Sequence, residues 1–437
     1  MVDLDAAAKA LNESDLPALC DEFYRGLKRR FPKKRLRALI DYALTEAAPP
    51  VAADGPEQFF IDSIGETKRL LLGEAPRGAS HIFAGADLDF ISDQEGLAGW
   101  SPVQCLNYLL MGKIQPRRKA VVVSSMRDDG IYVLEWIAHY LSLGFNHIIL
   151  YTNDNSDGSE ELLRLLASHG VITLVESEIT GTVPPEGKAY GHAIHLLHEL
   201  RDFEWAMFVD SDEYFVPSKT YKQSVVNVLA AVDRRFPERP PAGICYDWMW
   251  YISGMRFART SELLVERFQH ARPHHLTKSL ARIQDIVSMR LDHHPEPREG
   301  GLLVDSALQP IDMESIFWRT PQYKGGQVNH YWCRSFEEFA VKKFRGASLK
   351  LEVNQYDRPF SNFFAWNQYE TAGNHRPMHP ALLQKIKRKI EELRLLEGVA
   401  QLADGLDSNF SALVSRVTND ANLHEVYKAS EVEQEDF

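Results

Sequence analysis

The sequence has few cysteines, and none of them is placed for a structural role. Its 437 residues contain only four, which are far apart and form no CxxC pair: Cys20, Cys105, Cys245 and Cys333. A disulfide-stapled secreted domain needs a dense cysteine framework, and a structural zinc site needs closely spaced pairs. We therefore expect neither of these.

Excess positive charge and long apolar runs are also lacking. The chain has 49 Lys and Arg against 61 Asp and Glu, a formal net charge of −12, which argues against a nucleic-acid partner. No apolar run approaches the roughly 20 residues that span a bilayer. The start, Met1 to Asp5, lacks the basic and apolar regions of a signal peptide. We therefore expect a cytoplasmic protein.

The composition that is present is typical of globular domains. Hydrophobic residues make up 44% of the chain and charged residues 25%, which is enough for a sizeable core. At this length two or three units are expected. We predict a helical N-terminal extension over 1–115, an α/β domain over 116–350, and a C-terminal region over 351–437. The last region should hold a linker, one amphipathic helix over 381–396 and an acidic tail.

One segment reverses the overall sign of charge. Residues 25–37 contain eight basic side chains and no acidic one. The simpler interpretation is a solvated helix surface. The alternative is a patch that contacts an acidic partner or, peripherally, an anionic membrane.

From Lys119 onward, strand and helix patterns alternate. Short apolar runs predict strands at 120–124, 147–151, 171–175 and 205–209. Between them lie segments with helical spacing, two of which end at Gly144 and Gly170, where a left-handed residue is common. This β-α-β order predicts a mostly parallel sheet with helices on both faces.

Two carboxylates follow the strand at 205–209. Asp210 and Asp212 are two residues apart, so in an extended chain their side chains point the same way. Carboxylate oxygens are ligands that Mg²⁺ and Mn²⁺ prefer, and these ions also bind phosphates. Since ligands of open α/β sheets bind at the carboxyl ends of strands, the pair indicates a metal–diphosphate site. The alternative is an acidic corner that serves the turn and solubility.

A second acidic residue is expected at the same sheet edge. Asp154 comes just after the strand at 147–151, where an acidic side chain can bind a ribose or a base. The surrounding loop, 153–159, also favours turns, and Asp157 is suited to cap the next helix. Together with Asp210 and Asp212, Asp154 suggests one edge for a nucleotide and its phosphates.

These segments resemble, in their order, the family 2-like and family 92 glycosyltransferases of the GT-A fold. The resemblance covers about 118–350 and is carried by several motifs. These are Val133-Leu134-Glu135-Trp136-Ile137-Ala138-His139-Tyr140, Asp154-Asn155-Ser156-Asp157-Gly158, Phe208-Val209-Asp210-Ser211-Asp212-Glu213-Tyr214, Lys278-Ser279-Leu280-Ala281-Arg282 and Asn329-His330-Tyr331-Trp332-Cys333-Arg334.

The resemblance implies transfer of a sugar from a nucleotide-sugar donor, a UDP-sugar first among them, to a hydroxyl of a glycan or other acceptor. Asp210 and Asp212 match the family's DxD motif, which implies Mn²⁺ or Mg²⁺ as the cofactor. By motif position His330 is expected as a third ligand, with His293 and His294 as alternatives. Basic side chains available to the diphosphate are Lys278, Arg282, Arg334, Lys342 and Arg345.

One departure from the family concerns the loop that faces the nucleotide. The chain has Arg127-Asp128-Asp129 where the family has Lys-Asn-Glu. Arg127 and Asp129 are therefore candidate donor contacts, and the preferred base stays open.

The acceptor side is less defined. Asp247 and Glu266 are candidates for the general base of an inverting reaction, and the sequence does not choose between them. Trp248, Trp250 and Tyr251 offer flat faces for a sugar ring, or are simply core.

Two other functions remain. One is a nucleotidyltransferase on a related scaffold, although no Gly-rich phosphate loop follows the first strand. The other is a sugar- or nucleotide-binding protein without catalysis.

Overall fold

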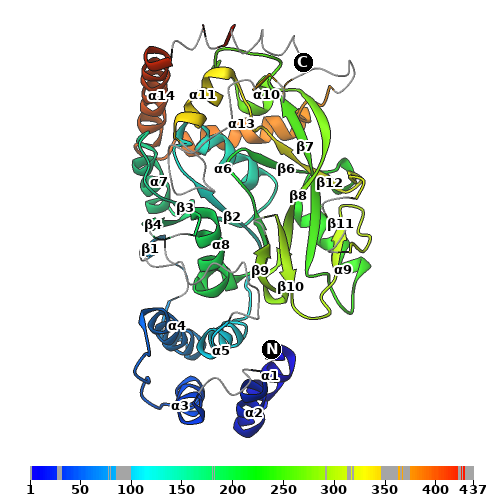
Figure 1. Ribbon diagram of the computed structural model, residues 1–437. Helices are drawn as coiled ribbons and strands as arrows, with labels where there is room; N and C mark the ends of the chain where they lie inside the picture. Colours follow the sequence, from blue (N-terminus) through cyan, green and yellow to red (C-terminus); the bar gives the residue numbers. More distant parts are fainter. Residues whose placement is uncertain are drawn as a thin grey trace.

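The computed structural model describes most of the chain. The described residues are 2–26, 32–76, 78, 80–84, 100–179, 181, 183–290, 293–312, 316, 319–345, 363–364, 367, 375–421, 425 and 427–428. They form a large twisted sheet with helices on both of its faces, and a group of N-terminal helices lies at one end (Figure 1).

The sheet has ten strands, and its first half is parallel. The order is β1 (His81–Ala84), β4 (Thr173–Ser177), β3 (His147–Thr152), β2 (Arg118–Met126) and β5 (Phe203–Phe208), and these pair in parallel. The mixed half continues with β8 (His270–Arg282), β7 (Gly243–Ile252), β12 (Gly326–His330) and β6 (Glu213–Pro217). β11 (Leu303–Asp305) pairs with β7, and β9 (Ile286–Arg290) with β10 (His294–Pro297) form a separate hairpin. The expected mostly parallel α/β class is confirmed.

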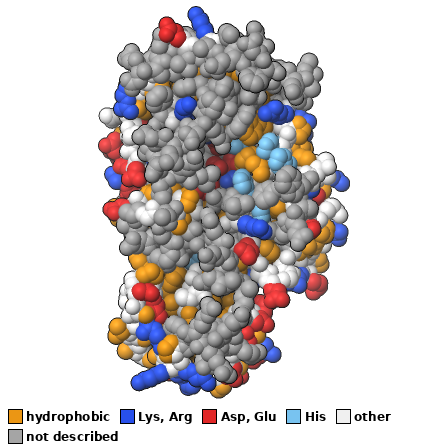
Figure 2. Space-filling view, viewed as in Figure 1, with side chains coloured by type: hydrophobic (Ala, Val, Ile, Leu, Met, Phe, Trp, Pro, Cys, Tyr) orange, Lys and Arg blue, Asp and Glu red, His pale blue; other side chains and the backbone are white. Residues whose placement is uncertain are grey.

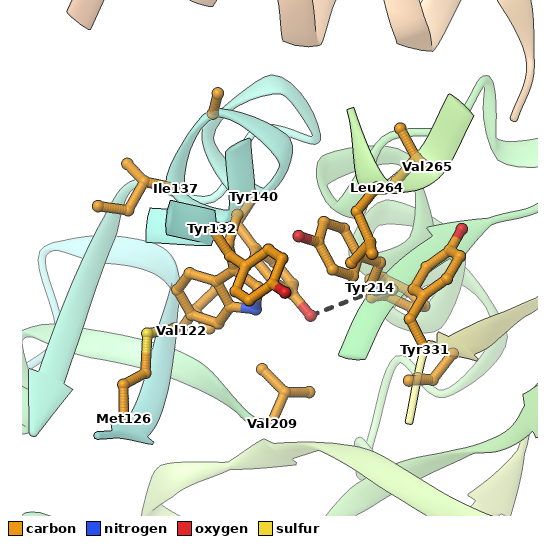
Figure 3. Packing of buried hydrophobic residues seen from close by; sticks show 14 of the residues in the cluster. Val122, Met126, Tyr132, Ile137, Tyr140, Val209, Tyr214, Leu264, Val265 and Tyr331 are labelled. Carbon is orange, nitrogen blue, oxygen red and sulfur yellow. Dashed lines mark hydrogen bonds between the residues drawn. The ribbon is translucent and has the colours of Figure 1, made fainter. Parts of the chain in front are cut away.

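Alternating side chains of the strands supply a core on each face. Val122 of β2 belongs to the core beneath α6 (Val133–Ser142) and α7 (Ser159–Ser168), part of which Figure 3 shows. Its neighbours Val121 and Val123 belong to the opposite core, beneath α8 (Pro185–His195). α9 (Val225–Arg235) packs on the first core through Val225, Val228, Leu229 and Val232. Both faces of the parallel strands are therefore buried, which explains their uninterrupted apolar runs.

The predicted helix ends agree with the structure. Gly144 and Gly170 follow the last turns of α6 and α7 and have φ angles of 93° and 70°. One expected strand starts two residues later than predicted, because β4 begins at Thr173. Short 3₁₀ helices connect several elements: η3 (Gly130–Tyr132), η4 (His198–Asp202), η5 (Lys219–Tyr221) and η6 (Ile283–Asp285).

The N-terminal region is helical and also contributes a strand to the sheet. Its helices are α1 (Leu4–Asn12), α2 (Leu16–Gly26), α3 (Lys33–Leu44), α4 (Gly55–Leu72) and α5 (Pro102–Met111), and they share a core of their own. The Asn107 side chain donates to the His195 carbonyl at 2.7 Å, and Tyr108 Oη donates to the Ile286 carbonyl at 2.6 Å. β1 lies between α4 and α5 in sequence but pairs with β4. Of the basic segment at 25–37, residues 27–31 lie outside the described part of the chain.

The C-terminal region holds two long helices instead of the single one predicted. α13 (Pro380–Arg394) matches the expected amphipathic helix, and α14 (Val399–Ala421) follows it after Gly398, whose φ is 80°. α11 (Phe336–Arg345) precedes both. The predicted acidic tail, 430–437, lies outside the described residues. Within the described part of the chain, no helix combines the length and the apolar character needed to cross a membrane.

A buried ion pair joins α11 to the short helix α10 (Leu264–Arg267). The Arg267 guanidinium donates to both oxygens of Glu338, at 2.7 and 2.8 Å, and both side chains are almost completely buried. Tyr132 Oη donates to the same carboxylate at 2.6 Å. Burial alone would raise the pKa of Glu338, but Arg267, Ser335 and Tyr132 lower it to about 2.

Glu338→Ala should therefore lower the free energy of unfolding by about 3–5 kcal/mol, because Arg267 keeps its buried charge without a partner. The wild type should lose the same contribution as the pH falls from the usual carboxyl value of 4.5 toward 2, since the unfolded chain binds the proton more tightly. Urea denaturation between pH 7 and pH 3 measures both effects. Lys389→Ala, which breaks an exposed pair with Glu392, should cost less than about 1 kcal/mol. Equal losses in the two variants would contradict the assignment.

Candidate active site

Asp210 and Asp212 lie in a tight turn between β5 and β6. β5 ends at Phe208, and the Glu213 amide donates to the Asp210 carbonyl at 3.2 Å. The prediction that the chain stays extended through both residues is therefore wrong. Trp136 Nε1 of α6 donates to the carbonyls of Asp210 and Glu213, each at 3.1 Å, and so fixes the turn.

A buried lysine lies beneath Asp210. Lys278 of β8 is 1% exposed, and its Nζ lies 3.0 Å from Asp210 Oδ1, 3.5 Å from Glu186 Oε1 and 3.6 Å from Glu213 Oε2. Burial alone would raise the pKa of Asp210, but Lys278 and Glu186 bring it below its ordinary value. For Glu213, burial and the nearby Asp210 charge raise the pKa well above its usual range. The Lys278 ammonium therefore lies within 3.6 Å of three carboxyl groups.

Asp212 has a different set of partners. Its Oδ2 accepts a hydrogen bond from Lys342 Nζ of α11 at 2.6 Å, and its Oδ1 lies 3.4 Å from His330 Nε2 at the end of β12. Burial alone would raise the pKa of Asp212, but Lys342 and His330 hold it well below its usual value. The structure thus brings Asp212, His330 and Lys342 together.

The Arg127-Asp128-Asp129 loop reaches the same turn through Asp129. Ser211 Oγ, between the two acidic residues, donates to Asp129 Oδ2 at 2.6 Å. Arg334 lies 3.3 Å from the other Asp129 oxygen and 3.7 Å above the centre of the Tyr132 ring. Burial would lower the pKa of Arg334, but Tyr132, Asp129 and Asp212 raise it, so it is a cation.

Aromatic and histidine rings adjoin the carboxylates on the side of β7 and β12. Trp248 lies 4.1 Å from His330, measured between ring centres, and Trp250 lies 5.2 Å from it. Trp332 stands 6.0 Å from Trp250 and beneath Lys342. Figure 2 shows histidine and apolar side chains gathered beside charged ones on this face. We name Trp248, Trp250, His330 and Trp332 the ring cluster.

Two predicted donor contacts lie near the expected sheet edge. Asp154 is exposed, directly follows β3 and has a φ of 44°. Arg127 follows β2, with its Nε 3.9 Å from Asp128 Oδ2. Each therefore stands at the carboxyl end of a parallel strand, as predicted.

Three other predicted residues are not brought to this cluster. Arg282 lies at the far end of β8, paired in register with Trp205, and contacts Asp285 at 2.5 Å. Asp247 is fully buried, and its two oxygens accept from Arg319 at 2.6 Å and from the Gln322 amide at 2.7 Å. Glu266 pairs with Lys387 of α13 at 2.6 Å. The side chain of Arg345 lies outside the described part.

Sequence reasoning gave no role to Glu186 and Glu213. Glu213 directly follows the acidic motif, so its position was a signal that could have been used. Glu186 stands in the first turn of α8, and no local pattern connects it with Lys278, 92 positions later in the sequence. Asp129, predicted as a donor contact, accepts a hydrogen bond from Ser211 of the turn, and its contact with a donor stays a prediction.

The chemical nature of the donors fits a divalent cation. Carboxylate and imidazole groups bind Mn²⁺ and Mg²⁺, and Asp212 and His330 already face each other. Lys278 and Lys342 occupy the carboxylates, and among the described residues no group of three or more His, Cys, Asp or Glu side chains is arranged to hold a metal ion. A bound ion would therefore compete with these ammonium groups for the charge of the carboxylates.

Lys278→Met should lower the free energy of unfolding by about 3–5 kcal/mol at pH 7, because three carboxyl groups lose their shared cation. The deficit should shrink as the pH falls toward 5, since the buried carboxylates of the variant bind protons more tightly than the unfolded chain does. Urea denaturation at several pH values measures this. Lys324→Met, at an exposed position, is the control and should stay within about 0.5 kcal/mol of the wild type. A deficit that grows on acidification would contradict this account.

Comparison with solved structures gives weak likenesses. S. aureus TarS aligns with a TM-score of 0.24 and 10% identity over 68% of this chain and 55% of that chain, so this chain spans about half the length of that protein. TarS residues 1–349 in complex with UDP align with a TM-score of 0.23 and 10% identity over 69% and 92% of the two chains. No curated protein matches the sequence.

A family model gives the more specific result. Glycosyltransferase family 92 matches residues 121–331, which run from β2 past His330 and include Asp154, Asp210, Asp212 and Lys278. The match confirms the resemblance to family 92, and the family 2-like designation stays a prediction. Residues 121–331, just under half of the chain, are therefore similar to the glycosyltransferases of family 92.

Proposed function

We propose that this protein transfers a sugar from a nucleotide-sugar donor to an acceptor hydroxyl, with Mn²⁺ or Mg²⁺ held by Asp210, Asp212 and His330. The observation that carries the proposal is the convergence of three cations, Lys278, Lys342 and Arg334, on the acidic turn after β5. This turn lies at the carboxyl end of a parallel strand, where ligands of such sheets bind.

The chemistry of the departing group explains why this convergence matters. Breaking the bond between a sugar and a nucleoside diphosphate develops negative charge on the diphosphate. When bound, the metal ion would supply Lewis-acid stabilisation of that charge. Lys342 is 18% exposed and stands where it can turn from Asp212 to a phosphate oxygen. Arg334 is fixed by Asp129 and Tyr132, so it needs little reorganisation to act as a preorganised cation.

The order of strands suggests how the donor lies. Asp154 and Arg127 follow β3 and β2, and the acidic turn follows β5. The ring cluster lies on β7 and at the end of β12. A donor with its nucleoside near Asp154 and Arg127 would place its diphosphate at the turn. The sugar would then point toward the ring cluster. We take a UDP-sugar as the first donor to test.

The ring cluster supports a glycan as the acceptor. Trp248 Nε1 and His330 Nδ1 are buried and have no hydrogen-bond partner within the described part of the chain. An unpaired buried donor or acceptor costs about 1–3 kcal/mol, and a carbohydrate hydroxyl could reach these two atoms only if neighbouring side chains moved. The ring of an acceptor sugar could pack on the exposed parts of the indoles. Asp247 and Glu266 stay candidates for the general base of the reaction. Contact of residues 25–37 with an anionic membrane stays a separate prediction.

Incubation with Mn²⁺ and a panel of UDP-, GDP- and CDP-sugars should release free nucleoside diphosphate. Asp212→Ala and Asp210→Ala should lower this release by at least about 100-fold, because the charge-stabilising site is lost. Coupled detection of the diphosphate measures the rate. Asp233→Ala, which removes an exposed carboxylate of α9 paired with Lys119, is the control and should retain the wild-type rate.

The alternative functions predict different results in these assays. Release that persists unchanged in EDTA would contradict metal dependence. Binding of a nucleotide without release would favour a binding protein. Formation of a nucleotide-sugar from a sugar phosphate and a nucleoside triphosphate would favour a nucleotidyltransferase.

A further inference from the structure

The second C-terminal helix, α14, lies outside the family-matched segment but packs beside its donor edge. In Figure 1 it stands next to α7, at the side of the parallel strands. Its residues contact α7, η3 and α11. η3 and α7 directly follow the loops that leave β2 and β3, so α14 adjoins both loops at the proposed nucleotide side.

The contact is close, because each loop presents a glycine to α14. A Cβ atom at Gly130 would lie 2.9 Å from Leu406 Cδ2, and one at Gly158 would lie 2.9 Å from Asn409 Nδ2. The Asn409 amide also donates to the Asp157 carbonyl at 2.8 Å. α14 thus holds the second loop by a directional hydrogen bond and the first by apolar packing.

Hydrogen bonds then join the two loops to each other. Asp157 Oδ2 accepts from the Gly130 amide at 2.9 Å, and the Asp128 amide donates to Asn155 Oδ1 at 2.8 Å. The Asp128 carboxylate accepts from the amides of Ser156 and Asp157. A displacement of Asp157 would therefore move the Asp128–Gly130 segment as well.

That segment carries the residue that fixes the acidic turn. Asp129 bonds Ser211 Oγ and faces Arg334, as described above. The charged residues and α14 also share a small cavity. Its walls include Asp129, Arg334 and Lys342 on one side and Leu406, Phe410 and Leu413 of α14 on the other. The contacts run without a gap from α14 to the cations proposed for the diphosphate.

We propose that α14 is a positioning element of the donor site, and that Asn409 is its positioning residue. Through Asp157 and Gly130 it sets the place of Asp129, and hence of Arg334 and the acidic turn that would receive the nucleoside diphosphate. The proposal rests on the proposed function, since it assigns the nucleoside diphosphate to this edge. It extends the donor site to a helix about 70 residues beyond the matched domain.

The substitution Asn409→Asp tests this proposal. It hardly changes the shape of the side chain, but the carboxylate cannot donate a hydrogen bond to the Asp157 carbonyl. Amide exchange in 128–130 and 156–159 should become faster, and binding of nucleoside diphosphate in MnCl₂ should weaken about three- to tenfold, in line with the loss of one hydrogen bond. UDP, GDP and CDP are titrated separately by calorimetry. In assays with a nucleotide-sugar donor, the KM for the donor should rise by a larger factor than that by which kcat falls.

Leu406→Ala should change exchange, binding and kinetics in the same direction. Ser415→Ala is the control: the residue is exposed on the same helix, and the variant should behave like the wild type.

The outcomes separate this inference from the function on which it rests. A wild-type protein that binds none of the three nucleotides would overturn both. Wild-type binding that Asn409→Asp and Leu406→Ala leave unchanged would overturn the role of α14 alone, even if amide exchange became faster, because the helix would then stabilise the loops without serving the ligand.

Discussion

The buried Lys278 ammonium is the constraint around which the centre of the molecule is arranged. A charge that is 1% exposed in the middle of a ten-stranded sheet is tolerable only with close anionic partners. The Asp210 carboxylate lies 3.0 Å from the ammonium, and the carboxyl groups of Glu186 in α8 and Glu213 in β6 lie 3.5 and 3.6 Å from it. The lysine therefore links α8, β6 and the acidic turn through one buried charge.

Most of the fold could be predicted, because its signals are local. Apolar runs of four or five residues predict β2, β3 and β5, since each is buried on both faces. Gly144 and Gly170 mark helix ends through their backbone conformation. β1 and α14 were not predicted for a different reason. β1 is four residues long and its pattern is weak, and it becomes a strand only by pairing with β4. The segment that forms α14 follows a glycine that interrupts the amphipathic pattern of α13.

For the candidate site, the sequence predicted which residues lie close together better than it predicted the backbone conformation that brings them there. Position after a buried strand identified Asp210 and Asp212, and motif order identified His330 and Lys342, which contact Asp212 in the structure. The assumption of an extended chain failed because the Glu213 amide closes a turn that side-chain spacing does not reveal. Arg282 was grouped with Lys278 by proximity in sequence, but four residues along a strand cover about 13 Å, so it lies at the far end of β8.

The pairing of β1 with β4 has a consequence for how the protein is made. His81 of β1 lies opposite Leu174 of β4, so this edge of the sheet cannot close until more than ninety further residues have left the ribosome. Without β1, the outer edge of β4 would present an open row of amides and carbonyls at the border of the parallel strands, which invites pairing between chains. The N-terminal segment thus serves as a built-in cover for the sheet border, and a protein shortened to its matched domain would be expected to self-associate.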